Sequence, residues 1–275
     1  MSDGSKEDRP KIEEDIAKYL LNMGYPASNV RSMMARHRYK GIRAVHLLAK
    51  DLNRPDAIIL NLGCGSGMNH FQLVKGFHPS KVYGLDTDKR AVELCRRYNP
   101  SASNYINEYD GSNIPFQDNF FDAIICDTVI EHVLDPGLFL KEMHRVLKPN
   151  GLVYITTANK LWPLEPHYNL LFLSWLPKKW ADYYMRLLRL KNKYYDINLF
   201  TYKKFINQLK QSGFKVYDAT FDIMARPELY DADKERPVLK YLKPIGKIIN
   251  AFPYFLKYQI QYFNFGWIII GKKTS

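Results

Sequence analysis

Short apolar runs alternate with segments of helical spacing through the middle of this 275-residue chain. The apolar runs predict strands near 57–62, 81–86, 104–108, 122–127 and 151–157, and the spacing between them predicts helices near 68–76, 88–98 and 137–147. Such alternation is typical of a parallel sheet with right-handed crossovers. We therefore expect an α/β fold built on one sheet.

The flanking segments break this alternation. Helical spacing at 11–23 and 31–50 precedes the first strand, and an aromatic and basic segment at 159–200, too long for a tight connection, predicts a cap with a helix near 177–191. Beyond it we expect a helix at 201–212, a strand at 214–224, a second insertion with a helix at 236–250, and a last strand at 265–272. The predicted division is a helical lid (1–50), a core (51–158, 201–224 and 264–275) and a cap (159–200 and 225–263).

A glycine-rich turn follows the first predicted strand. Residues 57–67 read AIILNLGCGSG, with glycines at 63, 65 and 67. Glycine lets the backbone bend sharply and approach a ligand without a Cβ clash. The dinucleotide fingerprint would place its third glycine where this chain has Met68, so the spacing differs from that motif.

Acidic residues end the next two predicted strands. Asp86, after KVYGL, is placed to accept hydrogen bonds from two ribose hydroxyls. The alternative role, a cap on the following helix, suits Asp88 better. Asp110 ends the third strand, and the segments IPF (114–116), FFD (120–122) and RVLKPNG (145–151) follow.

In this order, over roughly 55–160, these motifs resemble the class I S-adenosylmethionine (SAM)-dependent methyltransferases. The resemblance implies a Rossmann-like, predominantly parallel sheet with an antiparallel last strand, helical insertions forming a cap, SAM as cofactor, and Asp110 as acceptor for the adenine amino group. The predicted cofactor-binding residues are Asn61, Gly63, Cys64, Gly65, Gly67, Asp86, Thr87, Asp110, Gly111, Asp127 and Thr128.

Two positions depart from the family pattern. Asn61 stands where Asp or Glu is usual, which removes the electrostatic attraction to the cofactor's ammonium or sulfonium region. Asn150 replaces the first glycine of the PGG turn, a mild change because Asn tolerates left-handed backbone.

Candidate catalytic groups follow the fourth and fifth strands, because active sites in open parallel sheets lie at the carboxyl ends of strands. Asp127, Thr128, Glu131 and His132 follow strand four, and Asn159 follows strand five. A hydroxyl nucleophile benefits from a general base, and we expect His132 or His167 to supply it. The alternative for His132 is a structural histidine.

Other aromatic and basic residues are candidates for ligand contact. Trp162, His167, Tyr168 and Trp175 are expected to line an acceptor pocket. Arg36, Arg38 and Tyr39 either reach the cofactor carboxylate or the substrate, or lie on the surface. No metal site is expected.

Composition adds constraints on location and partners. The chain has no apolar run of 18 residues and no secretory signal, and Cys64, Cys95 and Cys126 are expected to be reduced core thiols of a cytoplasmic protein. The formal charge of +12 is concentrated in residues 170–275, which hold 19 Lys and Arg against 8 Asp and Glu. This excess indicates an anionic partner, such as a membrane surface, a phosphorylated acceptor or nucleic acid, or else serves solubility alone.

The predicted function is O-methylation of a small-molecule, glycan or lipid-linked acceptor. One alternative is an RNA methyltransferase that uses the basic C-terminal part, but the Asn/Asp-Pro-Pro-aromatic motif of amino-methylating enzymes is absent after strand four, which reads CDTV. Another is a SAM-binding protein without catalysis, if Asn61 is disabling. The acceptor and the oligomeric state stay open.

Overall fold

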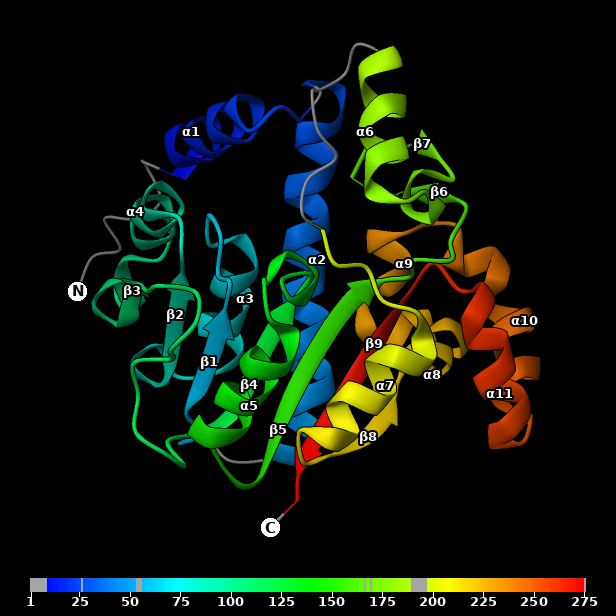
Figure 1. The fold of residues 1–275 in the computed structure, drawn as a ribbon. Coiled ribbons are helices and arrows are strands. Elements are labelled where there is room, and N and C mark those ends of the chain that lie inside the picture. Colours follow the sequence, from blue (N-terminus) through cyan, green and yellow to red (C-terminus); the bar gives the residue numbers. More distant parts are fainter. Residues whose placement is uncertain are drawn as a thin grey trace.

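The computed structural model describes residues 9–25, 27–52, 56–165, 167–168, 170–188 and 197–274. A seven-stranded sheet runs through it in the order β3-β2-β1-β4-β5-β9-β8, with helices on both faces (Figure 1). The strands of this sheet are β1 Ile59–Leu62, β2 Val82–Asp86, β3 Ile106–Glu108, β4 Phe121–Asp127, β5 Leu147–Ala158, β8 Phe214–Asp218 and β9 Gly266–Lys273. The cap adds a two-stranded hairpin, β6 Leu164–Glu165 with β7 Leu170–Leu171.

Helices precede, connect and follow these strands. They are α1 Arg9–Asn22, α2 Ala27–Leu52, α3 Met68–Gly76, α4 Lys89–Tyr98, α5 Pro136–Val146, α6 Lys178–Leu187, α7 Tyr202–Gln211, α8 Thr220–Ala225, α9 Ala232–Glu235, α10 Leu239–Asn250 and α11 Tyr254–Ile260. The described part of the chain contains no helix long and apolar enough to cross a membrane.

The predicted sheet is confirmed. β1 pairs in parallel with β2 and β4, β4 pairs in parallel with β5, and β9 is antiparallel to both of its neighbours. Because the first five strands point the same way, their carboxyl ends meet at one edge. The ligand-binding residues are therefore expected at that edge.

The two faces of the sheet bury different helices. Ile59 and Tyr154 face α2 and α3 through Leu48 and Leu73, whereas the next residue along β1, Leu60, belongs to the cluster that includes α5 and α7. In Figure 1, α5 and α7 lie in front of the sheet and α2 lies behind it. This alternation follows from the two-residue period of a strand.

The predicted strand at 214–224 is wrong in its second half, because β8 ends at Asp218 and α8 follows. Asp218 Oδ1 accepts a hydrogen bond from Thr220 N at 2.9 Å, which turns the chain out of the sheet. Apolar residues at 219, 221 and 223 mimic the alternation of a strand, and all three are buried in the helical segment.

The predicted lid and cap differ in how they meet the core. Ala44 and Leu48 of α2 are buried against the sheet, so half of this helix belongs to the core layer. The cap helix is α6, and residues 166, 169 and 189–196 of the predicted cap lie outside the described residues. The division into lid, core and cap stays a prediction.

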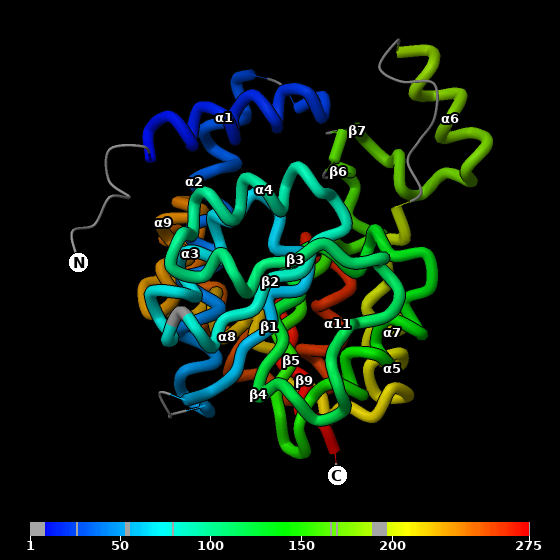
Figure 2. The backbone as a smooth tube through the Cα atoms, turned by 90° about the vertical axis from the view of Figure 1, so that its left-hand side faces the viewer, coloured from blue at the N-terminus to red at the C-terminus, as the bar shows by residue number. Residues whose placement is uncertain are grey.

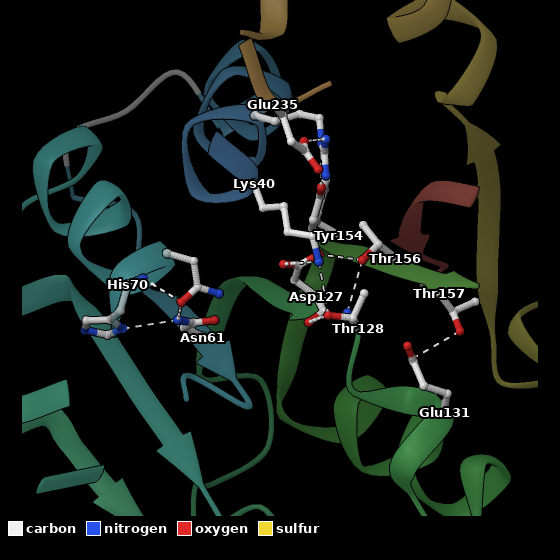
Figure 3. A network of polar contacts seen from close by, with 12 residues as sticks. Lys40, Asn61, His70, Asp127, Thr128, Glu131, Tyr154, Thr156, Thr157 and Glu235 are labelled. Atoms are coloured by element: carbon white, nitrogen blue, oxygen red, sulfur yellow. Dashed lines mark hydrogen bonds and ion pairs between the residues drawn. The ribbon is translucent and has the colours of Figure 1, made fainter. Parts of the chain in front are cut away.

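A buried ion pair links α2 to α9 of the second insertion. Arg43 donates to the Tyr154 hydroxyl at 3.1 Å and to the Glu235 carboxylate, and Arg43 and Glu235 are 6% and 8% exposed (Figure 3). Lys40 lies one turn before Arg43 on the same helix. The pair therefore fixes the part of α2 that carries Lys40.

Replacing Glu235 with Ala leaves the Arg43 charge buried without its acidic partner. We expect a loss of about 3–5 kcal/mol in the free energy of unfolding, measured by urea denaturation followed by circular dichroism. Lys234→Ala at the adjacent, exposed position is the control and should leave the midpoint unchanged. Equal midpoints for the two variants would contradict a structural role for the pair.

Candidate cofactor and acceptor site

A cavity of about 340 Å³ lies at the carboxyl ends of β1, β2 and β4. Eight of the predicted cofactor residues line it, namely Gly63, Cys64, Gly65, Gly67, Asp86, Thr87, Asp127 and Thr128. α1, α2 and the connection between them complete its wall with Tyr19, Tyr25, Met33, Met34 and His37. Figure 2 shows α1 lying across this end of the molecule, above α4.

The glycine turn forms one side of the cavity. Gly63 has a φ of 77°, and a Cβ there would lie 2.3 Å from a methyl group of Val129. Gly65 has a φ of 53°, but a Cβ there would meet no described atom within 4 Å. Gly63 is thus required by packing, whereas Gly65 keeps backbone open toward a ligand.

Asp86 stands beside this turn. Its Oδ2 accepts from Gly65 N at 2.7 Å and its Oδ1 from Asp88 N at 3.0 Å. Burial raises the pKa of Asp86, although these backbone N–H groups act in the opposite direction. The carboxylate lines the cavity and can accept further hydrogen bonds from ribose hydroxyls, while Asp88 caps α4 as expected.

Asn61 is fully buried and is not among the described residues that line the cavity. Its Nδ2 is 3.3 Å from Asn69 Oδ1 and 3.4 Å from His70 Nδ1, and its Oδ1 has no partner among the described residues (Figure 3). Burial lowers the pKa of His70 to about 3, so this ring is neutral. A carboxylate at 61 would face the side-chain oxygen of Asn69, and the amide suits this neutral surrounding.

Asp110 takes part in a turn outside the cavity. The carboxylate is exposed and its Oδ1 accepts from Ser112 N and Asn113 N at 2.8 and 2.9 Å. Neither Asp110 nor Gly111 is among the described residues that line the cavity, although the preceding Tyr109 is. The adenine contact of Asp110 stays a prediction.

The end of β4 carries a charged cluster. Lys40 Nζ is 3.4 Å from Asp127 Oδ2 and 3.2 Å from Thr128 Oγ1, and Asp127 also accepts from the Thr156 hydroxyl (Figure 3). Burial alone would raise the pKa of Asp127, but the charges of Lys40 and Arg43 hold it below its usual value. Thr128 has a φ of 57°, which is unusual for a β-branched residue and typical of functional sites.

The structure places other residues of α2 at the cavity than the three considered from the sequence. Arg36, Arg38 and Tyr39 are not among the described residues that line the cavity, and Arg38 pairs with Glu13 at 3.0 Å. His37 lines the cavity and Lys40 contacts its wall. Their spacing with Ala44 and Leu48 on the buried face was the available signal.

The two predicted catalytic histidines meet at the cavity's edge. The rings of His132, from the one-turn helix Ile130–His132, and of His167, from the cap, lie edge to face with centroids 5.3 Å apart. His132 lines the cavity, and burial together with His167 lowers its pKa to about 4. His167 Nδ1 is 2.7 Å from Glu165 Oε1, a buried carboxylate that sequence reasoning missed.

Glu131 lies next to this pair. It is 1% exposed, its Oε2 accepts from Thr157 Oγ1 at 3.1 Å, and burial raises its pKa (Figure 3). Asn159, also expected near the transferred methyl group, instead donates to the carbonyls of Tyr262 and Asn264, at 2.8 and 2.7 Å. Its amide thus ties the end of β5 to the second insertion.

Three aromatic residues of the cap, Trp162, Tyr168 and Trp175, are not among the described residues that line the cavity. Trp162 packs against Phe265 with ring centroids 5.9 Å apart, and Trp175 packs against Phe172 at 4.8 Å. Tyr168 packs against the small cluster around Leu173. An acceptor pocket between these residues stays a prediction.

The described cysteines are all free and buried.

The central part of this sheet, residues 60–155, is a domain of the class I SAM-dependent methyltransferase family. Residues 60–155 match the family model described as a methyltransferase domain. SAM is the methyl donor of this family. The predicted family and the predicted cofactor are confirmed.

Curated relatives match part of the chain, and a solved structure shares its fold. A fatty-acid O-methyltransferase of Mycolicibacterium smegmatis is 32% identical over 138 residues, covering 50% of this chain and 48% of the relative. A ubiquinone biosynthesis O-methyltransferase of Rickettsia akari is 29% identical over 160 residues, covering 54% and 61%. The chain thus spans about half to three fifths of their lengths. The solved SAM-dependent methyltransferase from Mesorhizobium loti shows the same fold, with a TM-score of 0.51, 18% identity and coverage of 83% and 98%.

Asp86→Ala should weaken SAM binding by about 1.5–3 kcal/mol, roughly 10- to 100-fold, because the ribose hydroxyls lose a charged acceptor. Titration calorimetry with SAM measures the change. Asp118→Ala, on the surface beside Arg145, is the control and should bind SAM like the unchanged protein. Unaltered binding by the Asp86 variant would remove this residue from the cofactor site.

His70 should make the protein less stable in acid. Its pKa is about 3 when folded and ordinarily 6.5, so the unfolded chain takes up a proton that the folded chain excludes. The free energy of unfolding is unaffected by His70 above pH 6.5 and decreases as the pH falls toward 3. At pH 4.5 this decrease is about 2–3 kcal/mol. Urea unfolding at pH 7 and 4.5 should show a smaller acid loss for His70→Gln. The same loss in both proteins would refute the assignment.

Proposed function

We propose that this protein transfers the methyl group of SAM to an oxygen atom of a small apolar or lipid-linked acceptor. The observation that carries the proposal is the position of His132, which lines the cofactor cavity and contacts His167 of the cap. Groups able to act on an acceptor oxygen thus stand beside the cavity. The fatty-acid and ubiquinone O-methyltransferases among the relatives support an apolar acceptor.

One set of residues would bind the cofactor and another would act on the acceptor. The turn at Gly63–Gly67 and Asp86 would hold SAM, whose sulfonium supplies the methyl group. Methyl transfer is an in-line displacement, so alignment of the two reactants and exclusion of water supply most of the catalysis. His132 and His167 act on the acceptor oxygen, and Glu165 fixes the orientation of His167 through Nδ1.

Peripheral contact with an anionic membrane is part of the proposal. The basic excess of residues 170–275 coincides with exposed apolar side chains on α10 and α11, including Tyr241, Ile248 and Phe255. Lysines near an anionic surface contribute about 1 kcal/mol each, and apolar side chains at the interface add to this. RNA is the second candidate partner, because the same lysines would attract its phosphates.

Transfer from methyl-labelled SAM separates these acceptors. The protein is incubated at one fixed salt concentration with a long-chain fatty acid or a long-chain quinol in anionic vesicles, or with RNA. We expect label in the lipid extract. Label in RNA alone would overturn the proposal in favour of the second candidate, and SAM binding without transfer to any acceptor oxygen would favour a non-catalytic protein.

His167→Ala should lower turnover, with the acceptor found in the labelling experiment, by about 100-fold or more. This is the usual contribution of a group that accepts or donates the proton of the reacting oxygen. SAM affinity should stay within about twofold, because His167 belongs to the cap and not to the cofactor wall. His78→Ala, at an exposed loop position, is the matched control. A collapse of SAM binding with unchanged turnover at saturating SAM would contradict this role.

A further inference from the structure

We propose that Glu131, His132 and His167 bind a divalent first-row metal ion at the acceptor side of the cavity. The three residues each offer one ligand atom, and these atoms all lie within 4.8 Å of one another. Ligand atoms around a tetrahedral zinc ion are about 3.4 Å apart, as follows from bond lengths near 2.1 Å. Small side-chain rotations therefore suffice to close the site.

A second layer of hydrogen bonds orients the proposed ligands. Glu165 Oε1 contacts His167 Nδ1 at 2.7 Å, which leaves Nε2 of that ring for a metal. Glu165 Oε2 is itself fixed by the backbone N–H groups of His167 and Tyr168, at 2.9 and 2.8 Å. Thr157 holds one oxygen of Glu131. A carboxylate behind a histidine ligand is the usual support of a metal site.

The electrostatics of the cluster favour a cation. Glu131 and Glu165 are 1% and 0% exposed, and neither forms an ion pair with a lysine or arginine within the described ranges. The nearby Lys40 contacts Asp127 and Thr128 instead. Buried carboxylates need compensating charge, and a divalent ion between Glu131 and the two rings would supply it.

The ligand set indicates the kind of ion and its role. Two imidazoles and one carboxylate suit Zn²⁺, Fe²⁺, Co²⁺ or Mn²⁺ and leave coordination positions open. Because His132 also lines the cofactor cavity, an open position would face the place where the acceptor oxygen meets the methyl group. A metal-bound hydroxyl loses its proton more readily. Only this role rests on the proposed function; the binding of the ion does not.

Metal binding is tested on the full chain, stripped with a chelator and titrated with Co²⁺ in the absence of SAM. We expect one Co²⁺ per chain, with the visible absorption of nitrogen and oxygen ligation, and displacement by Zn²⁺. His132→Gln and His167→Gln should each weaken binding at least 100-fold, and Glu165→Gln about 10- to 100-fold. His78→Gln is the matched control and should bind like the unchanged protein. Circular dichroism and SAM titration show that each variant is folded.

The outcomes separate this inference from the proposed function. No Co²⁺ uptake by the unchanged protein, or equal uptake by the folded double variant His132→Gln/His167→Gln, overturns the metal site. If methyl transfer is still measured in either case, the proposed function is retained, and the two histidines act on the acceptor oxygen without a metal ion. Metal uptake without SAM binding would retain the site and refute the proposed function.

Discussion

The close packing of the turn between β1 and α3 is the constraint on which the cofactor site depends. Gly63 N and Cys64 N both donate to the carbonyl of Leu85, at 2.7 and 3.0 Å, so the turn is tied to β2 immediately before Asp86. Gly63 also packs directly against Val129 beyond the end of β4. A side chain at 63 would displace Val129 and the segment that follows β4. The glycine therefore fixes the relative positions of the residues that line the cavity.

Asn61 illustrates how a departure from the family pattern is accommodated. The residue meets Asn69 and His70 from the first turn of α3, and the three side chains form a neutral buried group. His70 is kept neutral by burial. An acid introduced at one position would require a donor or a charge from the other two. The amide at 61 is thus one part of a coordinated arrangement, and its effect on cofactor binding depends on all three residues.

The sheet and eight of the residues that line the cavity could be predicted from the sequence, because glycines, acidic residues at strand ends and apolar periodicity are local signals. The sequence was insufficient where distant segments determine a role. Asn159 follows a strand as a catalytic residue would, but its partners are carbonyls more than 100 residues away. Lys40 acquires its role only when α2 packs beside β4, and Glu165 only when the cap folds back toward His132. Helical spacing indicates which face of α2 is buried, but it does not encode the partners that Lys40 and Glu165 meet in the folded chain.

In the proposed function, the core would hold the cofactor and the insertions would complete the acceptor side. Cofactor contacts come from turns whose geometry is set by the sheet. On the acceptor side, His167 is positioned by a hairpin loop through Glu165, and α2 is held in place by Glu235 of the second insertion. Changes in these insertions can alter what approaches the methyl group without disturbing the turn at Gly63. We therefore expect acceptor choice to depend on these insertions, which lie outside the residues 60–155 that match the family model.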